Sequence, residues 1–225
     1  MISIIMPNYN HGEFIKYAIK SCLENEFLNE IIIVDGGSTD NSFSEVKKLM
    51  KSDDRILYIE SKDNGPAEAL NKALNKASGE LIGWLNSDDL YNNNIFNKIL
   101  SEFQRDKNLK ILYGKGANIY ENGDFKNFYP TFKPNVGISK FLDGCFICQP
   151  TVFFKRELLK DIGGFNKNYK TCFDFELWLR VFSKYAISEI GFIDDLLAFT
   201  RVHKKTITYN NQILVNIESA ILLKK

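Results

Sequence analysis

Residues 31–42, IIIVDGGSTDNS, place a β-branched apolar run directly before a polar turn. The unbroken run Ile31–Val34 is typical of a strand that is buried on both faces of a parallel sheet. The cluster Asp35–Asp40 that follows it offers turn residues and helix N-cap residues. Beyond the turn, apolar residues fall at the spacing of one helical face: Phe43, Val46, Leu49 and Met50. This stretch therefore predicts a strand, a polar turn at its carboxyl end, and a helix.

The same unit recurs on either side of that stretch. Further strands are expected at three apolar runs: Ser3–Met6, Ile56–Ile59 and Leu81–Leu85. Apolar residues at helical spacing follow Gly12 and predict a helix there. Another helix is expected to begin at Pro66, with Gly79 as its C-cap. Strands that alternate with helices in this way are the pattern of right-handed βαβ crossovers. The sequence predicts an α/β fold.

The pattern changes after about residue 107. Three short strand candidates follow, separated by a loop-rich aromatic stretch: Ile111–Tyr113, Ala117–Tyr120 and Thr151–Phe154. Asp174–Ser183 is predicted to be a helix, and a last amphipathic helix is predicted from Ile207 onward. We expect one compact domain in three parts, residues 1–107, 108–206 and 207–225.

Composition limits the class of protein. The chain has 225 residues, of which 44% are apolar and 25% charged, so it is expected to be globular. A net charge of +1 gives no basic surplus, and we expect no nucleic-acid partner. No apolar run approaches the length of a membrane span, and the opening MISIIMPNYN lacks the features of a signal peptide. The four cysteines, including Cys145 and Cys148 of CFIC, are expected to be core or lining residues in a reducing cytoplasm.

Three polar clusters stand at the ends of expected strands, namely Pro7–Asn10, Asp35–Asp40 and Asn86–Asp89. In an open parallel sheet, ligands bind outside the carboxyl ends of the strands. The adjacent carboxylates Asp88 and Asp89 suit Mg²⁺ or Mn²⁺, which take oxygen ligands and keep positions for phosphates. From position alone, an ordinary turn explains them equally well. The chain contains neither GxxxxGK[ST] nor GxGxxG, so phosphates are expected to meet a metal rather than a glycine-rich loop.

A series of motifs resembles the family 2 glycosyltransferases over about residues 2–206. Each motif is weak by itself, but they occur in the family's order. They are SIIMPNYN (3–10), IVDGGSTDNS (33–42), DNG (63–65), ALNKA (69–73), ASGE (77–80), WLNSDD (84–89), QPTVFF (149–154), GGF (163–165), FDFELWLR (173–180) and RVH (201–203).

This resemblance implies a GT-A fold, which is a Rossmann-like, mostly parallel sheet flanked by helices. It also implies an inverting transfer of a sugar from a nucleotide diphosphate donor to a hydroxyl group. By similarity, Pro7 and Tyr9 line the base pocket and Asp35 accepts a hydrogen bond from the base. Asp63 lies near the base or the ribose. UDP is implied only because the family uses it most often. The first part of the chain then binds the nucleotide-sugar, and the second part binds the acceptor and carries the base.

The resemblance also implies a metal-dependent enzyme that uses Mn²⁺ or Mg²⁺. The segment Asn86–Asp89 occupies the family's DxD position, so the metal falls to Asp88 and Asp89, one of which meets the ribose instead. Asp174 matches the general base, although a helix-start carboxylate is the alternative. Arg201 and His203 close a loop over the diphosphate, and His203 is also a candidate metal ligand.

Alternative functions remain open at this point. A sugar-nucleotide-binding subunit without turnover is suggested by Asn86, which stands where the family commonly has a carboxylate. A sugar nucleotidyltransferase would need a glycine-rich basic loop after the first strand, and Pro7–Gly12 does not supply one. For the enzyme, the acceptor is expected to be a glycan or a lipid-linked molecule in cell-surface polysaccharide or glycoconjugate synthesis.

The last helix leaves a further choice. Its apolar face is expected either to pack on the body or to dock on the inner face of the plasma membrane, where a cytoplasmic enzyme would meet lipid-linked acceptors. That face comprises Ile213, Leu214, Ile217, Ile221 and Leu222, ahead of Lys224 and Lys225. The sequence does not indicate an oligomeric state.

Overall fold

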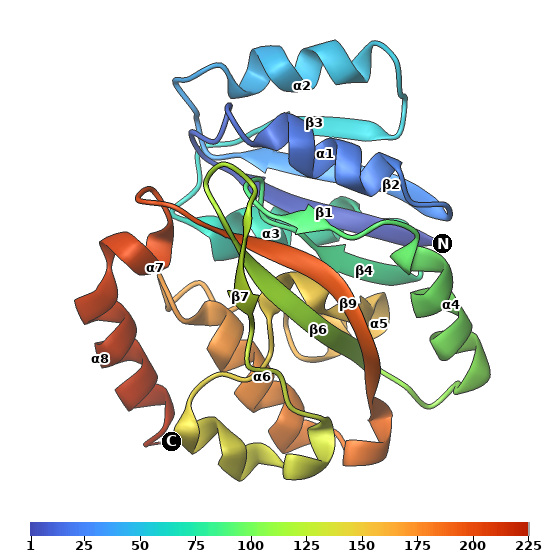
Figure 1. Cartoon of the computed structure of the whole chain (residues 1–225), viewed down its shortest axis with the longest axis vertical. Coiled ribbons are helices and arrows are strands. Elements are labelled where there is room, and N and C mark those ends of the chain that lie inside the picture. The colour runs from blue at the N-terminus through green and yellow to red at the C-terminus, as the bar shows by residue number, and fades with distance from the viewer. Residues whose placement is uncertain (225) are drawn as a thin grey trace.

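A computed structural model describes residues 1–224 as a nine-stranded mixed sheet with helices on both faces (Figure 1). The strand order is β3-β2-β1-β4-β8-β6-β9-β5, and β7 pairs with β6 off that path. The strands are β1 (Ile2–Asn8), β2 (Leu28–Asp35), β3 (Ile56–Glu60), β4 (Leu81–Trp84), β5 (Leu90–Tyr91), β6 (Ile111–Tyr120), β7 (Phe125–Phe128), β8 (Phe153–Lys155) and β9 (Ile190–Val202). The α-helices are α1 (Ile15–Leu23), α2 (Ser42–Met50), α3 (Pro66–Lys76), α4 (Ile95–Arg105), α5 (Arg156–Asp161), α6 (Phe173–Lys184), α7 (Ile207–Asn210) and α8 (Gln212–Leu222).

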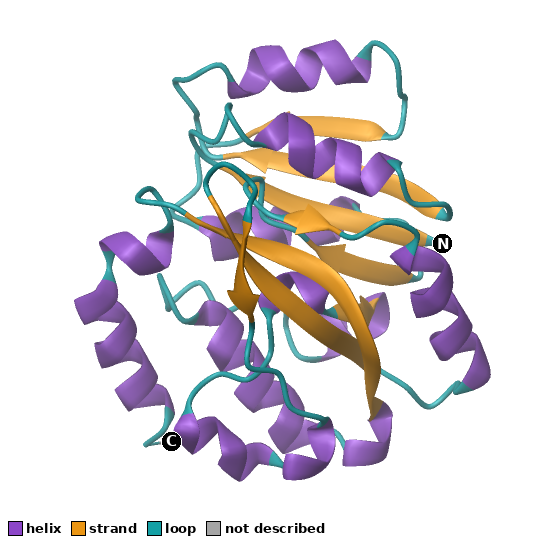
Figure 2. Ribbon diagram, viewed as in Figure 1, coloured by secondary structure: helices purple, strands orange, loops and turns teal. Residues whose placement is uncertain are grey.

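The first half of the chain builds the parallel part of the sheet. β1 pairs with β2 on one side and with β4 on the other, and β2 pairs with β3, all in parallel. Successive residues of β1 enter opposite cores: Ile5 packs in the core that contains α3, and Ile4 in the core that contains α1. Figure 2 shows helices on both faces of these strands. The predicted α/β alternation is confirmed.

The second half adds antiparallel pairing and departs from the expected strands. β8 pairs antiparallel with both β4 and β6, so one sheet continues past residue 107. The two short strands expected between 111 and 120 are one strand, β6, whose register against β9 shifts around Lys115. A Cβ on Gly114 would come within 2.6 Å of Leu197, and one on Gly116 would collide with Cys148. Both glycines are therefore sites of close packing within the strand. The strand expected from Thr151 begins at Phe153, after a 3₁₀ turn.

One other local prediction is wrong. α3 ends at Lys76 with an extended Ala77, so Gly79 is not its C-cap. Gly79 instead lies against β1, where a Cβ would come within 2.5 Å of Ser3 Oγ. In α2, Phe43 does not join the core: its ring is half exposed and packs on Tyr58 with 5.1 Å between the ring centroids. Phe43 keeps the helical spacing of its neighbours, but it covers the edge strand β3 instead of entering the core.

The C-terminal segment is two helices, α7 and α8, that meet at Asn211. α8 docks on the body through Glu218 and Leu222, both buried. Ile213, Ile217 and Ile221 point outward, with exposed fractions of 78%, 51% and 46%. The expected apolar face is therefore divided, and most of it does not pack on the body. Lys225, part of the expected segment, lies outside the described residues.

The loops at the carboxyl ends of β1, β2 and β4 lie at one edge of the sheet, near the end of β9 (Figure 1). Within residues 1–224, the helices are all too short or too polar to cross a bilayer. The predicted polar clusters therefore meet at the carboxyl ends of the parallel strands.

Candidate active site

A cavity of about 830 Å³ opens at this edge of the sheet. This size suits a ligand as large as a nucleotide-sugar. The structure brings seven of the predicted site residues to its wall: Pro7, Tyr9, Asp63, Asp88, Asp89, Asp174 and Arg201. Asp35 and His203 are not wall residues: Asp35 is hydrogen-bonded within the loop after β2, and His203 is hydrogen-bonded to Asp88.

One end of the cavity wall carries an exposed aromatic ring and the loop after β2. Tyr9 follows β1 and is 61% exposed. The backbone of Gly36 lies beside it, because a Cβ there would contact Tyr9 and Asp63 at about 3.5 and 3.3 Å. Asp35 itself is buried, and its carboxylate accepts hydrogen bonds from Asn8, from the Gly37 amide (2.9 Å) and from Ser38. Asp35 therefore fixes the loop, and Gly36 forms the wall.

Asp63 presents an acceptor without a partner. Its Oδ1 accepts a hydrogen bond from the Gly65 amide at 3.1 Å. Its Oδ2 is buried, and within residues 1–224 it has no hydrogen-bond donor. Burial raises the pKa of this carboxyl, with the Gly65 bond opposing that effect. A buried acceptor that the protein leaves unpaired is a candidate to receive a hydrogen bond from a ligand.

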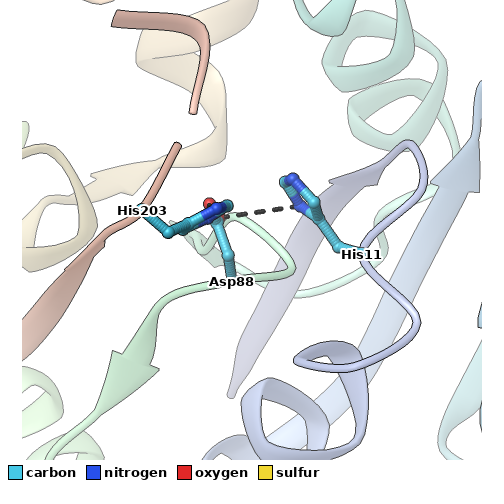
Figure 3. Close-up of side chains that lie close together, drawn as sticks. All are labelled: His11, Asp88 and His203. Atoms are coloured by element: carbon cyan, nitrogen blue, oxygen red, sulfur yellow. Dashed lines mark hydrogen bonds and ion pairs between the residues drawn. The ribbon is translucent and has the colours of Figure 1, made fainter. Parts of the chain in front are cut away.

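Asp88 lies between two histidines (Figure 3). His203 Nε2 donates to Asp88 Oδ2 at 2.9 Å, and His11 Nδ1 lies 3.9 Å from Asp88 Oδ1. One ligand atom from each of the three residues lies within 4.8 Å of the others. Burial favours the neutral form of Asp88, but the His203 hydrogen bond and the two imidazoles outweigh it and keep its pKa below the usual value. A carboxylate and imidazole nitrogens together are a donor set that fits a divalent metal ion.

Asp89 faces away from that cluster and is held by the chain. Its Oδ1 accepts from Thr200 Oγ1 and from the Arg201 amide, both at 2.9 Å. Its Oδ2 accepts from Asn86 Nδ2 at 3.1 Å. Burial and the nearby charge of Asp88 raise the pKa of Asp89. Asp89 thus joins β9 to the turn after β4.

Asn86 and Gln149 form a small amide network in the cavity wall. Asn86 Nδ2 also donates to Gln149 Oε1 at 2.9 Å, and Asn86 Oδ1 accepts from Trp84 Nε1 at 2.9 Å. Gln149 Nε2 donates to the Trp84 carbonyl at 2.8 Å. An aspartate at position 86 could not donate to Asp89, so the amide satisfies a contact that a second carboxylate would break.

Arg201 is largely committed to backbone carbonyls. Its Nε donates to the Asp88 carbonyl at 2.9 Å and its Nη1 to the Glu121 carbonyl at 2.7 Å. The guanidinium also lies 5.0 Å above the Phe14 ring. Although Arg201 lines the cavity, its hydrogen bonds mainly hold the Asp88 turn against β9 and the end of β6.

Asp174 stands in the first turn of α6, as predicted. Its Oδ1 accepts from the Phe175 amide at 2.7 Å. Burial raises the pKa of Asp174 to about 6, and the Phe175 bond only partly opposes this. The helix N-terminus favours the ionised form. A carboxylate with a pKa near neutrality, facing a cavity, is suited to accept a proton.

The segment that precedes α6 is fixed by α8. The Glu218 carboxylate is buried and accepts from the amides of Lys170, Thr171 and Cys172, each at 2.9 Å. Thr171 Oγ1 donates to it at 2.7 Å. These contacts end two residues before Asp174, so the C-terminal helix helps to set the position of that carboxylate.

Several site residues were not identified from the sequence. They are His11, Gln149, Tyr129 and Glu218. His11 follows the polar turn after β1, and Gln149 lies in a quoted motif, so both carried a weak positional signal. Glu218 carried none, because its partners are more than 40 residues away. The four cysteines are free, and Cys148 is a buried residue that also lines the cavity, as predicted.

Comparisons with known proteins give one consistent result. The family model described as glycosyl transferase family 2 matches residues 3–163. A protein of Rickettsia conorii named as an uncharacterized glycosyltransferase is 30% identical over 217 residues, which cover 91% of this chain and 34% of the relative. The chain thus spans about a third of the length of that relative.

Solved structures show the same fold. Residues 1–349 of TarS from S. aureus, in complex with UDP, match with a TM-score of 0.74 at 22% identity, covering 96% of this chain and 64% of that one. The mannosyltransferase PcManGT of Pyrobaculum calidifontis, in complex with GDP-Man and Mn²⁺, matches with a TM-score of 0.66 at 19% identity, covering 91% and 57%.

Proposed function

The chain belongs to the family 2 glycosyltransferases, and on that premise we propose that it transfers a sugar from a UDP-sugar to a hydroxyl group with inversion. Its fold is GT-A, as the resemblance implied. The observation that carries the proposal is one cavity whose wall holds Tyr9, Asp63, Asp88 and a raised-pKa Asp174. Nucleotide recognition, charge neutralisation and proton removal would then take place in one site.

Recognition of the nucleotide falls to Tyr9 and Asp63. An exposed tyrosine ring offers a stacking surface for the base. The unpaired Asp63 Oδ2 is suited to accept the single N–H of uracil that faces away from the ribose. We assign this contact to Asp63 in place of Asp35, because the Asp35 carboxylate is already filled by loop donors.

Asp174 is the proposed base. As the acceptor oxygen bonds to the anomeric carbon, its proton passes to the Asp174 carboxylate and the bond from that carbon to the diphosphate oxygen breaks. The attack comes from the face opposite the leaving diphosphate, so the configuration inverts. Burial raises the pKa of this carboxylate, which strengthens it as a proton acceptor.

Asp88 and His203 are the residues proposed to hold Mn²⁺ or Mg²⁺. Such an ion, when bound, neutralises negative charge on the departing diphosphate. Asp89 is proposed as the support of this site rather than as a ligand, because both of its oxygens accept hydrogen bonds from the chain. Arg201 is proposed to hold the Asp88 turn in place beneath the diphosphate.

A subunit that binds a sugar nucleotide without turnover is the alternative, and Asn86 was its best support. The Asn86 amide donates to both Asp89 and Gln149, so the residue that stands in place of a carboxylate has hydrogen-bond partners here. A sugar nucleotidyltransferase finds no support in the loop after β1. We therefore favour an active transferase.

The acceptor is proposed to be a glycan or a lipid-linked molecule in cell-surface polysaccharide or glycoconjugate synthesis. The outward isoleucines of α8 support contact with a membrane surface where lipid-linked acceptors are found. We place the reaction on the cytoplasmic side of that membrane, where nucleotide-sugars are made.

Donor hydrolysis and thermal stability test the proposal directly. UDP-, GDP- and dTDP-sugars would each be added with Mn²⁺, Mg²⁺ or EDTA. We expect UDP-sugars with a divalent ion to raise the melting temperature and to release UDP slowly, and Asp63→Asn to weaken UDP binding. A stable protein that neither binds nor hydrolyses any donor of the panel would contradict it.

A further inference from the structure

The proposed function uses Asp88 and His203 but leaves His11 without a role. His11 lies in the turn after β1, and its side chain is 18% exposed at the cavity wall. Its Nδ1 is 3.9 Å from Asp88 Oδ1 and 3.0 Å from Ser87 Oγ. The rings of His11 and His203 lie edge to face with 5.5 Å between centroids, on either side of Asp88 (Figure 3).

We propose that His11 is a third protein ligand of the metal ion, and that the site selects Mn²⁺ or a similar transition metal over Mg²⁺. The inference rests on the proposed function for the presence of an ion at Asp88. It adds the identity of the ligand set, two imidazole nitrogens and one carboxylate, and the chemical class of ion that this set prefers.

The turn that carries His11 is built to hold it in place. Asn10, directly before it, has a left-handed backbone with φ of 55°. Asparagine adopts that conformation more readily than most residues with a side chain. Here the Asn10 amide donates to Ser38 Oγ at 2.8 Å, and Asn10 Oδ1 accepts from the Thr39 amide at 2.8 Å.

The other side of His11 is fixed as well. The Gly12 amide donates to Asp40 Oδ2 at 2.7 Å, and a Cβ on Gly12 would collide with Asn41. The loop after β2 therefore clamps the backbone both before and after His11. Such support on both sides is what positioning of a functional side chain requires.

One donor atom from each residue lies within 4.8 Å of the others, so small side-chain shifts bring them to a shared ion. Ligands that occupy neighbouring positions around an ion at about 2.1 Å lie roughly 3 Å apart. His203 Nε2 and Asp88 Oδ2 are already 2.9 Å apart, and His11 Nδ1 needs to approach Asp88 by about 1 Å. The Ser87 hydroxyl can rotate away. His203 Nδ1 accepts a bond of 3.3 Å from the Lys205 amide, so that amide has to turn away before Nδ1 can carry the ring proton when Nε2 binds an ion.

The chemistry of these donors determines the preferred ion. Mg²⁺ favours oxygen ligands and gains little from imidazole, whereas affinity for nitrogen ligands rises along the first transition series from Mn²⁺. Asp89 does not add a second carboxylate, since its oxygens are held by Thr200, Arg201 and Asn86. Two histidines and one carboxylate leave the remaining coordination positions for diphosphate oxygens and water.

Electron spin-echo spectroscopy of Mn²⁺ bound with saturating UDP tests the ligand set. The experiment uses the full chain and detects ¹⁴N nuclei coordinated to Mn²⁺, so it needs no sugar transfer. We expect two coordinated imidazoles in the wild type and one in His11→Gln. We also expect His11→Gln to weaken Mn²⁺ binding about 10- to 100-fold while changing Mg²⁺ binding much less.

Lys205→Gln is the matched control, because Lys205 lines the same cavity but offers no metal ligand. It should keep both imidazole signals. The inference is wrong if His11→Gln retains the wild-type nitrogen signal and Mn²⁺ affinity, or if it weakens UDP binding equally in Mn²⁺ and in EDTA, which would make His11 a diphosphate contact. Coordination by His11 without any sugar transfer would leave this inference standing and refute the proposed function.

Discussion

Replacing Asp174 by asparagine separates its chemical role from its structural role. Asparagine has nearly the same shape, and its Oδ1 can still accept the Phe175 amide. It cannot take a proton from an acceptor hydroxyl. We expect Asp174→Asn to lower the transfer rate by about 10²- to 10⁴-fold, the usual contribution of a general base.

The same substitution should make the protein more stable at neutral pH. Asp174 has a pKa of about 6 against an ordinary 3.8, so the folded state binds a proton more tightly than the unfolded state. Folding stability therefore falls as pH rises from about 4 to about 6, because the ionised carboxylate is disfavoured by burial. Each tenfold difference in proton affinity corresponds to about 1.4 kcal/mol, which gives a cost of about 3 kcal/mol at pH 7.

Asparagine removes that cost. We expect the variant to gain up to about 3 kcal/mol at pH 7, or roughly 5–10 °C in melting temperature, and to match the wild type near pH 4. In the wild type, kcat/KM should rise about tenfold per pH unit up to pH 6 and then level off, since the base must be ionised.

Transfer assays and denaturant unfolding across pH 4–8 measure both effects. Asp161→Asn is the control, because that carboxylate is paired with Lys184 and Tyr185 away from the cavity. It should change neither the transfer rate nor the pH profile, and it should not add stability. Wild-type transfer by Asp174→Asn would rule out Asp174 as the base, and a loss of stability at pH 7 would rule out a strained ionised carboxylate there.

Of three further predictions, two concern the supports of the site and one concerns the outward face of α8. Glu218→Gln should lower the free energy of unfolding by about 2–4 kcal/mol and reduce kcat with little change in donor KM, because it places an amide donor against backbone donors. Denaturant unfolding and steady-state kinetics measure these effects, and an unchanged kcat would contradict the positioning role of Glu218. Asn86→Asp should destabilise the protein by about 1–3 kcal/mol at pH 8 and less at pH 5, because two adjacent carboxylates must then share one proton; equal melting curves at both pH values would contradict this. The third variant replaces the three outward isoleucines of α8 with serine: Ile213, Ile217 and Ile221. It should reduce co-sedimentation with anionic vesicles at least tenfold, since each replacement removes about 1 kcal/mol or more of favourable apolar transfer into the membrane. Unchanged binding would exclude this surface as a membrane contact.

The parallel half of the fold was predictable because its signals are local. The run Ile31–Val34 can only be buried on both faces, and the turn residues after it stop the strand at a definite place. The helices that follow are fixed by apolar spacing and by Pro66 at the start of α3. These features need no knowledge of what lies across the sheet.

The errors came from contacts between distant segments. Gly79 resembles a helix C-cap, but its lack of a side chain is required by Ser3 on β1. Gly114 resembles a strand break, but it admits Leu197 on β9. In the same way, α8 was expected to pack through an apolar face, yet it docks through the carboxylate of Glu218 as well as Leu222, because three amides before α6 need an acceptor.

The acidic members of the site could be predicted, and the geometry that orders them could not. Asp88 and Asp89 are adjacent in sequence and lie at the end of one strand, yet one turns toward two histidines and the other toward Thr200. Adjacent residues in a tight turn project in different directions, so the pair cannot act as two equivalent ligands. In the proposed metal site the third ligand is His11, and the loop after β2 supports its approach to Asp88 by holding Asn10 in a left-handed conformation. A metal site of this kind depends on three separate loops, and its preference among metal ions follows from which side chains those loops bring together rather than from the acidic motif alone.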